Sequence, residues 1–226
     1  MEKNRNTIDL YALLEHEGGR LIYEGTEGCV VQSADGETLM SDILSGEQLC
    51  RVLALLDTSE MTQIVVKSRD AQEKVSAAYD FHGFNPCSQW SYWGQKPEID
   101  PACDIRPLEL CHAELAAQHY KLFPNTEPYI TERIEAGRLW GLFEDGKLAG
   151  FIGTHSEGSM GMLEVFPEYR RKGYGYALEA FLIDWHLQRG WHPYCHVVDG
   201  NEASLHLQKR LGMEQAALPA IWAWKE

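Results

Sequence analysis

The chain has 226 residues, enough for one large or two small domains, and its 44% apolar and 24% charged residues exclude wholesale disorder. No apolar run approaches the ~18 residues of a membrane-spanning helix, and the polar start leads into no secretory signal. The formal net charge of −14 argues against nucleic-acid and membrane partners, so an anionic ligand would need a local basic patch.

Patterns of apolar residues predict alternating strands and helices in the first part of the chain. Strand-like runs occupy residues 21–24, 29–33, 38–43, 63–67 and 87–93, and helical spacing occupies 48–56 and 71–81. The pair Asp35-Gly36 is typical of a turn between the second and third runs.

A proline-rich stretch follows at residues 95–107, where Pro97, Pro101 and Pro107 interrupt any periodicity. Proline removes a backbone donor and biases the preceding residue towards extended conformations. We therefore predict a linker at residues 97–103, between a domain of residues 1–96 and a second domain of residues 104–226.

The second part reads as strand, helix, helix, three strands, helix, strand, helix and strand. Strands are predicted at residues 104–108, 139–144, 148–154, 160–166, 194–198 and 216–224, and helices at 113–123, 128–137, 176–189 and 201–211. Asp145-Gly146 is a strong hairpin signal between two of the strands. This order predicts an α/β (α+β) fold in which helices flank a mixed sheet.

The two parts of the chain have helix-ending glycines and predicted elements in the same order. Gly83 and Gly212 each end a predicted helix and lie 129 positions apart, and at this offset the helices and strands before and after them coincide. Few residues are identical, so an internal repeat rests mainly on element order. The alternative is two unrelated α+β units.

Residues 165–176, which read VFPEYRRKGYGY, lie between a predicted strand and a predicted helix. Gly173 and Gly175 allow backbone conformations and close approaches that other residues do not. The start of a helix offers free N–H groups to an anion, and the run Arg-Arg-Lys at 170–172 adds three positive charges. Together these features favour a phosphate-binding loop, although neither the Walker A nor the Rossmann pattern is present.

The order R-x-x-G-x-G after V-x-P, carried by Arg170, Gly173 and Gly175, resembles the acyl-CoA pyrophosphate loop of the GNAT superfamily of N-acetyltransferases. The run at residues 197–213 is similar to the closing strand, helix and turn of that family, most of all in the branch of glycine N-acyltransferases. The resemblance covers residues 103–226. With the repeat, it implies a tandem of two GNAT-like halves, each a mixed sheet flanked by helices.

The resemblance also implies how acetyl-CoA, as cosubstrate, would be held. The implied contacts come from the strand before the loop, the loop and the last helix: Leu163, Glu164, Val165, Arg170, Arg171, Lys172, Gly173, Tyr174, Gly175, Tyr176, Asn201 and Ser204. The counterpart of the loop in the first half, residues 41–47, has no Arg or Lys and two acids. The first half is therefore expected to bind no CoA, and to complete the sheet or wall the acceptor site.

The catalytic residues are less clearly marked. Many family members carry a tyrosine general acid where this chain has Gln208, which has no proton to donate at useful pH. For the base, Glu157 is the first candidate and His155 the second, because they lie near the start of the strand that leads into the loop; a water chain is the alternative. His196 and Glu164 are also expected near the site, but Glu164 faces away from it unless a bulge turns its strand.

The chain is thus expected to be an N-acetyltransferase that transfers acetyl from acetyl-CoA to a primary amine of a small molecule or amino acid, by direct attack in a ternary complex. Alternatives are a non-catalytic acetyl-CoA-binding or regulatory module, and a longer-chain acyl-CoA:amino-acid N-acyltransferase. Weak candidates for acceptor contacts are Glu127, Tyr129 and Arg133. No C-x-x-C pair or metal spacing appears, so we expect reduced cysteines, a cytoplasmic location and no metal. Monomer and homodimer both stay open.

Overall fold

The computed structural model describes residues 2–120 and 126–225. The first half contains α1 (Ile8–His16), β1 (Arg20–Gly25), β2 (Gly28–Gln32), β3 (Thr38–Ser41), α2 (Gly46–Leu53), β4 (Gln63–Val66), α3 (Arg69–Tyr79) and β5 (Gly83–Ser91). The second contains β6 (Asp104–Pro107), α4 (Ala113–His119), α5 (Glu127–Glu135), β7 (Leu139–Glu144), β8 (Lys147–Thr154), β9 (Met160–Val165), α6 (Tyr174–Leu187), β10 (Tyr194–Val198), α7 (Glu202–Leu211) and β11 (Glu214–Trp224). Short 3₁₀ turns precede α4 and α6.

The mixed α/β class predicted from the sequence is confirmed. At Asp145 and Gly146 both φ angles are positive, at 50° and 75°, as a primed hairpin turn requires. The helix predicted at 113–123 is seen as α4 as far as His119, and residues 121–123 of that prediction lie outside the described residues. The sequence analysis missed α1, whose buried face combines apolar side chains with Asp9 and so lacks a clean helical pattern.

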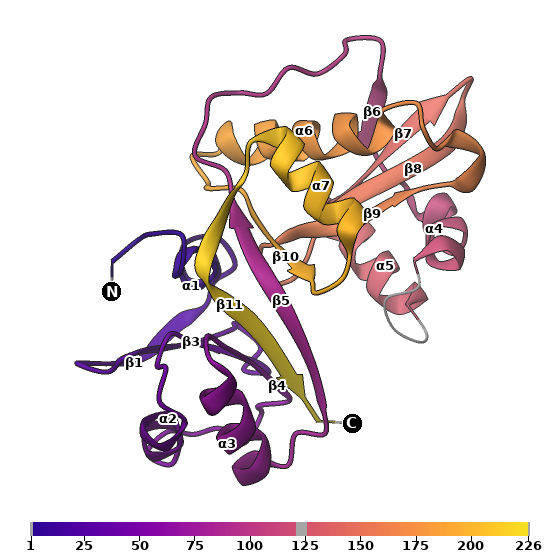
Figure 1. Cartoon of the computed structure of the whole chain (residues 1–226). Coiled ribbons are helices and arrows are strands. Elements are labelled where there is room, and N and C mark those ends of the chain that lie inside the picture. Colours follow the sequence, from indigo (N-terminus) through magenta and orange to yellow (C-terminus); the bar gives the residue numbers. More distant parts are fainter. Residues whose placement is uncertain (1, 121–125, 226) are drawn as a thin grey trace.

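The strands form two sheets (Figure 1). A seven-stranded sheet has the order β1-β2-β3-β4-β11-β5-β10, and a four-stranded sheet has the order β6-β7-β8-β9. Only the β3–β4 pair is parallel among the described strand pairs; the rest are antiparallel.

The two halves exchange their last strands. β11, which ends the second half, lies between β4 and β5 of the first, while β5 lies between β11 and β10 of the second. Figure 1 shows these two long strands side by side, joining the lower and upper parts of the molecule. The predicted linker therefore lies between two segments of the chain that contribute strands to the same sheet. The division into two domains at residues 97–103 stays a prediction.

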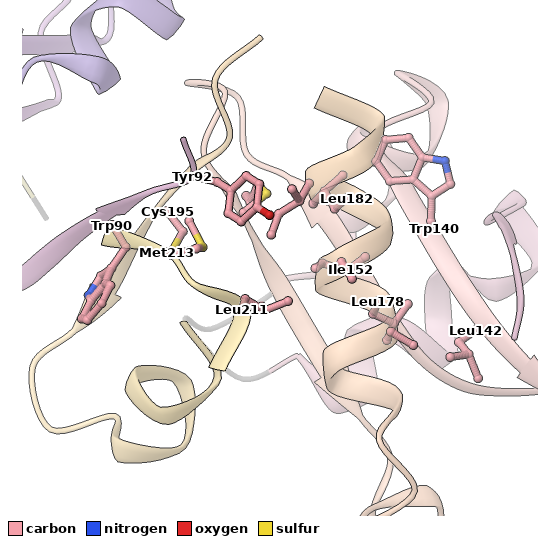
Figure 2. Packing of buried hydrophobic residues seen from close by; sticks show 14 of the residues in the cluster. Trp90, Tyr92, Trp140, Leu142, Ile152, Leu178, Leu182, Cys195, Leu211 and Met213 are labelled. Atoms are coloured by element: carbon pink, nitrogen blue, oxygen red, sulfur yellow. The ribbon is translucent and has the colours of Figure 1, made fainter. Parts of the chain in front are cut away.

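Helices cover both faces of the second half. α6 and α7 pack on one face, where Leu178, Leu182 and Leu211 meet Cys195 and Trp140 in the largest core (Figure 2). α4 and α5 cover the other face of the small sheet through a second cluster that includes Ile130 and Phe151. The apolar side chains of α6 thus anchor this helix in the core, and the loop that precedes its N-terminus is held in place by it.

A buried polar network joins the halves around β5. The Nζ of Lys67 lies 2.5 Å from Asp9 Oδ2 and donates to Gln89 Oε1 at 2.8 Å, and both charged side chains are fully buried. His196 joins from β10, with its Nε2 2.9 Å from the same Gln89 oxygen. Trp222 Nε1 donates to His196 Nδ1 at 3.1 Å. Because an indole N–H can only donate, Nδ1 is an acceptor and the imidazole proton lies on Nε2.

Candidate active site

The loop predicted to bind phosphate joins β9 to the N-terminus of α6. Gly173 caps the helix with φ of +85°, and Arg171 has φ of +69°, so two residues near the turn adopt the left-handed conformation. A Cβ added at Gly173 would meet nothing within 4 Å, and one at Gly175 would meet only Leu207 and Val165 at 3.8 and 3.9 Å. The first amides of the 14-residue helix α6 therefore open onto a space that an anion can approach.

The three basic side chains of the loop have different partners. Arg170 is exposed, and its Nε donates to the carbonyl of Val165 at 3.0 Å. Lys172 forms an ion pair with Glu144 at 2.8 Å, and Tyr174 donates its hydroxyl to the same carboxylate at 2.5 Å. These contacts, led by that of Lys172, lower the pKa of Glu144. The positive charge placed over the helix start therefore comes mainly from the two arginines, of which Arg171 is also exposed.

The strand before the loop has an open edge. β9 pairs with β8, and β10 pairs with β5, but no ladder joins β9 to β10 in the described chain. The amide of Phe166 donates to the carbonyl of Ala149 at 2.9 Å, so the N–H and C=O of Val165 point away from β8. The N–H of Val165 therefore points towards the side that faces β10, while its carbonyl accepts the hydrogen bond from Arg170 Nε.

A bulge interrupts β9 and decides which way its side chains point. Pairing with β8 shifts register between Phe151 and Gly153, and Met162 adopts φ of +54°. Gly150 allows the close approach of the bulged strand, because a Cβ there would lie 2.5 Å from the carbonyl oxygen of Glu164. Leu163 and Val165 pack towards α6. Glu164 is half-buried, and its pKa is raised by desolvation and lowered in part by Arg170.

On the other side of the open edge, the turn between β8 and β9 holds both candidate bases. The Tyr129 hydroxyl from α5 and His155 Nδ1 are 2.7 Å apart, and burial lowers the pKa of His155, so its imidazole is neutral at pH 7. Glu157 is buried; its Oε1 accepts from the Ser159 hydroxyl, and its backbone carbonyl accepts from Tyr194 on β10 at 2.9 Å. The structure therefore brings Glu157, His155 and Tyr129 together where β9 and β10 approach.

The remaining acceptor-side candidates differ in their surroundings. Arg133 is buried on α5, hydrogen-bonded to Glu132, with its guanidinium 5.9 Å from the centre of the Tyr129 ring. Glu127 is exposed at the start of the same helix. His196, which was expected near the site, has both of its ring nitrogens engaged in the network around Gln89.

The last helix contributes residues in roles that the sequence analysis did not assign. Asn201 is exposed, and its side chain caps α7 by accepting from the amide of Ser204 at 3.2 Å. Gln208 is only 2% exposed and donates to Glu179 Oε1 on α6 at 2.7 Å. Nothing in the local pattern around Glu179 distinguishes it from a surface residue of an amphipathic helix, so this buried pair could be found only from the tertiary structure.

In the first half, the counterpart of the open edge and of the glycine loop is closed by strand pairing and by a carboxylate. β3 and β4 form a parallel ladder from Thr38–Gln63 to Met40–Val65, and the loop before α2 has only four residues, 42–45, against eight, 166–173, before α6. The Asp70 carboxylate accepts from the amide of Gly46 at 2.7 Å, at the start of α2. An anion thus already occupies the helix start that phosphate would need.

Comparison with known proteins agrees with this geometry. Residues 108–213, slightly less than half of the chain, match the acetyltransferase (GNAT) family. This segment is similar to the acetyltransferase domains of the GNAT family. No curated protein matches the chain significantly.

Solved structures resemble the chain over nearly its whole length. A protein from Drosophila melanogaster has a TM-score of 0.68 and 14% identity, covering 98% of this chain and 90% of its own. A protein described as a GNAT-family acetyltransferase from Novosphingobium aromaticivorans has a TM-score of 0.61 and 16% identity, covering 99% and 100%. A GNAT-family acetyltransferase from Colwellia psychrerythraea has a TM-score of 0.54 and 15% identity, covering 100% and 98%. At these identities the likeness shows the fold of the whole chain.

Other classes of site find no support in the part of the chain that the structure describes. No group of three or more His, Cys, Asp or Glu side chains there is arranged to hold a metal ion. No helix there is long and apolar enough to span a membrane. Among the described residues, which include all six cysteines, no disulfide is formed.

Proposed function

We propose that this protein is an acyl-CoA-dependent N-acyltransferase that transfers acetyl from acetyl-CoA to a primary amine of a small molecule or an amino acid. The observation that supports it most strongly is the glycine loop at the N-terminus of α6, which follows the open edge of β9. The loop suits a pyrophosphate, and the edge suits an extended chain with amide groups, which pairs with backbone as a strand does.

In the proposed reaction the amine attacks the thioester carbonyl directly. The new C–N bond forms as the C–S bond breaks, and the outward-pointing amide of Val165 stabilises the oxyanion between these steps. The amine must lose a proton, for which Glu157 is the proposed base, with neutral His155, held by Tyr129, as the second candidate. Gln208 has no proton to give, so the thiolate takes its proton from solvent or from the substrate ammonium.

The loop assignment is tested by acetyl-CoA calorimetry on the full chain with Gly173→Asp. A carboxylate there would face the pyrophosphate, so binding should become undetectable, from a dissociation constant in the micromolar range, about −8 kcal/mol. Gly190→Asp is the matched control, because Gly190 also has positive φ, of +72°, and no atom near its missing Cβ, but lies at the far end of α6. Micromolar binding by Gly173→Asp would contradict the assignment.

Turnover separates an enzyme from a binding module. Release of free thiol from acetyl-CoA should rise when amines and amino acids are added one at a time. A protein that binds acetyl-CoA but releases no thiol with any acceptor would be a regulatory module.

A further inference from the structure

Two buried polar atoms on facing helices lack hydrogen-bond partners in the described part of the chain. They are Oε2 of Glu179 on α6 and Oε1 of Gln208 on α7. The two side chains are already joined by the 2.7 Å hydrogen bond from Gln208 Nε2 to Glu179 Oε1. Buried groups of this kind are almost always paired, so the two orphan oxygens need a common explanation.

A single proton on the carboxyl group of Glu179 explains both oxygens that lack a hydrogen-bond partner. A carboxylic acid and a primary amide can form a reciprocal pair, in which the acid O–H donates to the amide oxygen and the amide N–H donates to the acid carbonyl. Such a pair satisfies Glu179 and Gln208 together, whereas an ionised Glu179 would leave two acceptors facing each other in a medium of low dielectric constant.

The surroundings of Glu179 favour the neutral form. The core residues of β7 and β8 in the same cluster as α6, such as Trp140 and Ile152, are apolar, and Glu144 at the end of β7 is engaged by Lys172 and by Tyr174 at the start of α6. The polar or titratable groups towards it are Gln208, with Ser204 behind it on α7, and the thiol of Cys195 on β10, which burial keeps neutral. On α6 itself Tyr176 lies one turn away beneath Arg210, and Asp184, which pairs with Lys96, and His186 lie further along the helix. Burial raises the pKa of Glu179 to about 7.

We propose that Glu179 is a positioning residue: it carries its proton in the folded protein, forms a reciprocal acid–amide pair with Gln208, and so holds α7 where acetyl-CoA binds. The inference rests on the proposed function, because α6 begins at the pyrophosphate loop and α7 carries the expected pantetheine contacts Asn201 and Ser204. Loss of the proton makes the two helices repel at this point and adds a negative charge behind the phosphate-binding helix. Both effects weaken acetyl-CoA binding, and by linkage acetyl-CoA binding promotes protonation of Glu179.

The test is the acetyl-CoA dissociation constant of the full chain, measured by calorimetry between about pH 6 and about pH 8.5. In the parent protein binding should weaken about tenfold across this range. Glu179→Gln keeps two reciprocal amide hydrogen bonds without a titrating group, so it should bind tightly and lose most of the pH dependence. Glu179→Leu should bind weakly throughout, and Glu135→Gln, which removes an exposed carboxylate on α5, should follow the parent.

Parent-like pH dependence in Glu179→Gln would overturn the proposal. A purely structural role for the carboxyl predicts a uniform loss in both variants and no rescue by Gln. If no form binds acetyl-CoA at any pH, the proposed function fails instead. In that case the pH dependence of unfolding still reports whether Glu179 is protonated in the folded state.

Discussion

Among single residues, Glu179 couples folding to pH, because burial raises the pKa of its carboxyl group to about 7 from an ordinary 4.5. Below about pH 4.5 the group is protonated in both the folded and unfolded states. As the pH rises to about 7, the unfolded state loses its proton first, so the stabilisation from the neutral pair is progressively lost.

The first prediction is that Glu179→Gln stabilises the protein relative to the parent above pH 7, by up to about 3 kcal/mol, and gains little below about pH 4.5. The measurement is urea unfolding of both proteins at several pH values. The difference between them isolates this one group from the other carboxylates. A difference that does not change with pH would show that Glu179 titrates alike in the folded and unfolded states, and so that burial does not raise its pKa.

The second prediction concerns the base. Glu157→Gln keeps the size of the side chain but removes its proton-accepting oxygen, so kcat/KM at neutral pH should fall about a hundredfold or more. His155→Gln is the paired variant, to be measured against pH with the same acceptor. If Glu157→Gln behaves like the parent and His155→Gln loses activity, the imidazole held by Tyr129 is the base; if neither loses activity, deprotonation runs through water.

At the scale of elements, the same order of helices and strands occurs twice, as α1-β1-β2-β3-α2-β4-α3-β5 and α5-β7-β8-β9-α6-β10-α7-β11. The two copies differ where the ligand would bind. Among the described residues β9 and β10 do not pair with each other, whereas β3 and β4 do, and Asp70 occupies the start of α2. This repetition of element order is what the predicted duplication requires, and the duplication, with a first copy that lacks a phosphate loop, stays a prediction.

The third prediction is one acetyl-CoA per chain. Calorimetric titration should give a stoichiometry of one, and Asp70→Asn should leave it unchanged, because the parallel β3–β4 ladder still closes the first half. A second site, or one created by Asp70→Asn, would mean that the ladder opens in solution.

At the scale of the whole molecule, the exchanged strands make the two halves interdependent. β11 has both of its neighbours, β4 and β5, in the first half, and the neighbour of β10 in the sheet is β5. The buried Lys67–Asp9 pair and its contacts to Gln89 and His196 span the same boundary, and burying one such charge without the other costs about 3–5 kcal/mol.

The fourth prediction is that residues 100–226 alone do not form a stable acetyl-CoA-binding domain, although the linker precedes them. The isolated fragment would expose both edges of β11 and the edge of β10 that pairs with β5 in the full chain. Circular dichroism and hydrogen exchange should show an unstable or aggregated fragment, while the full chain should unfold in one transition. A cooperatively folded fragment that binds acetyl-CoA would refute this coupling.

The sequence by itself determined the local features of this protein. The spacing of apolar residues located nearly every helix and strand, because an element that buries one face must carry apolar side chains at the period of that element. Gly173 and Gly175 marked the loop for which we propose phosphate binding, because the backbone conformation and the close approach needed there are local requirements that leave a visible residue pattern.

The tertiary structure alone decided which distant residues meet. The exchange of β5 and β11 depends on pairing between strands more than a hundred residues apart, for which hydrophobic alternation gives no partner. The Glu179–Gln208 pair, the engagement of His196 with Gln89 and Trp222, and the blocking of α2 by Asp70 are likewise contacts between separate elements. A side chain's protonation and availability depend on what surrounds it, and those surroundings exist only once the chain has folded.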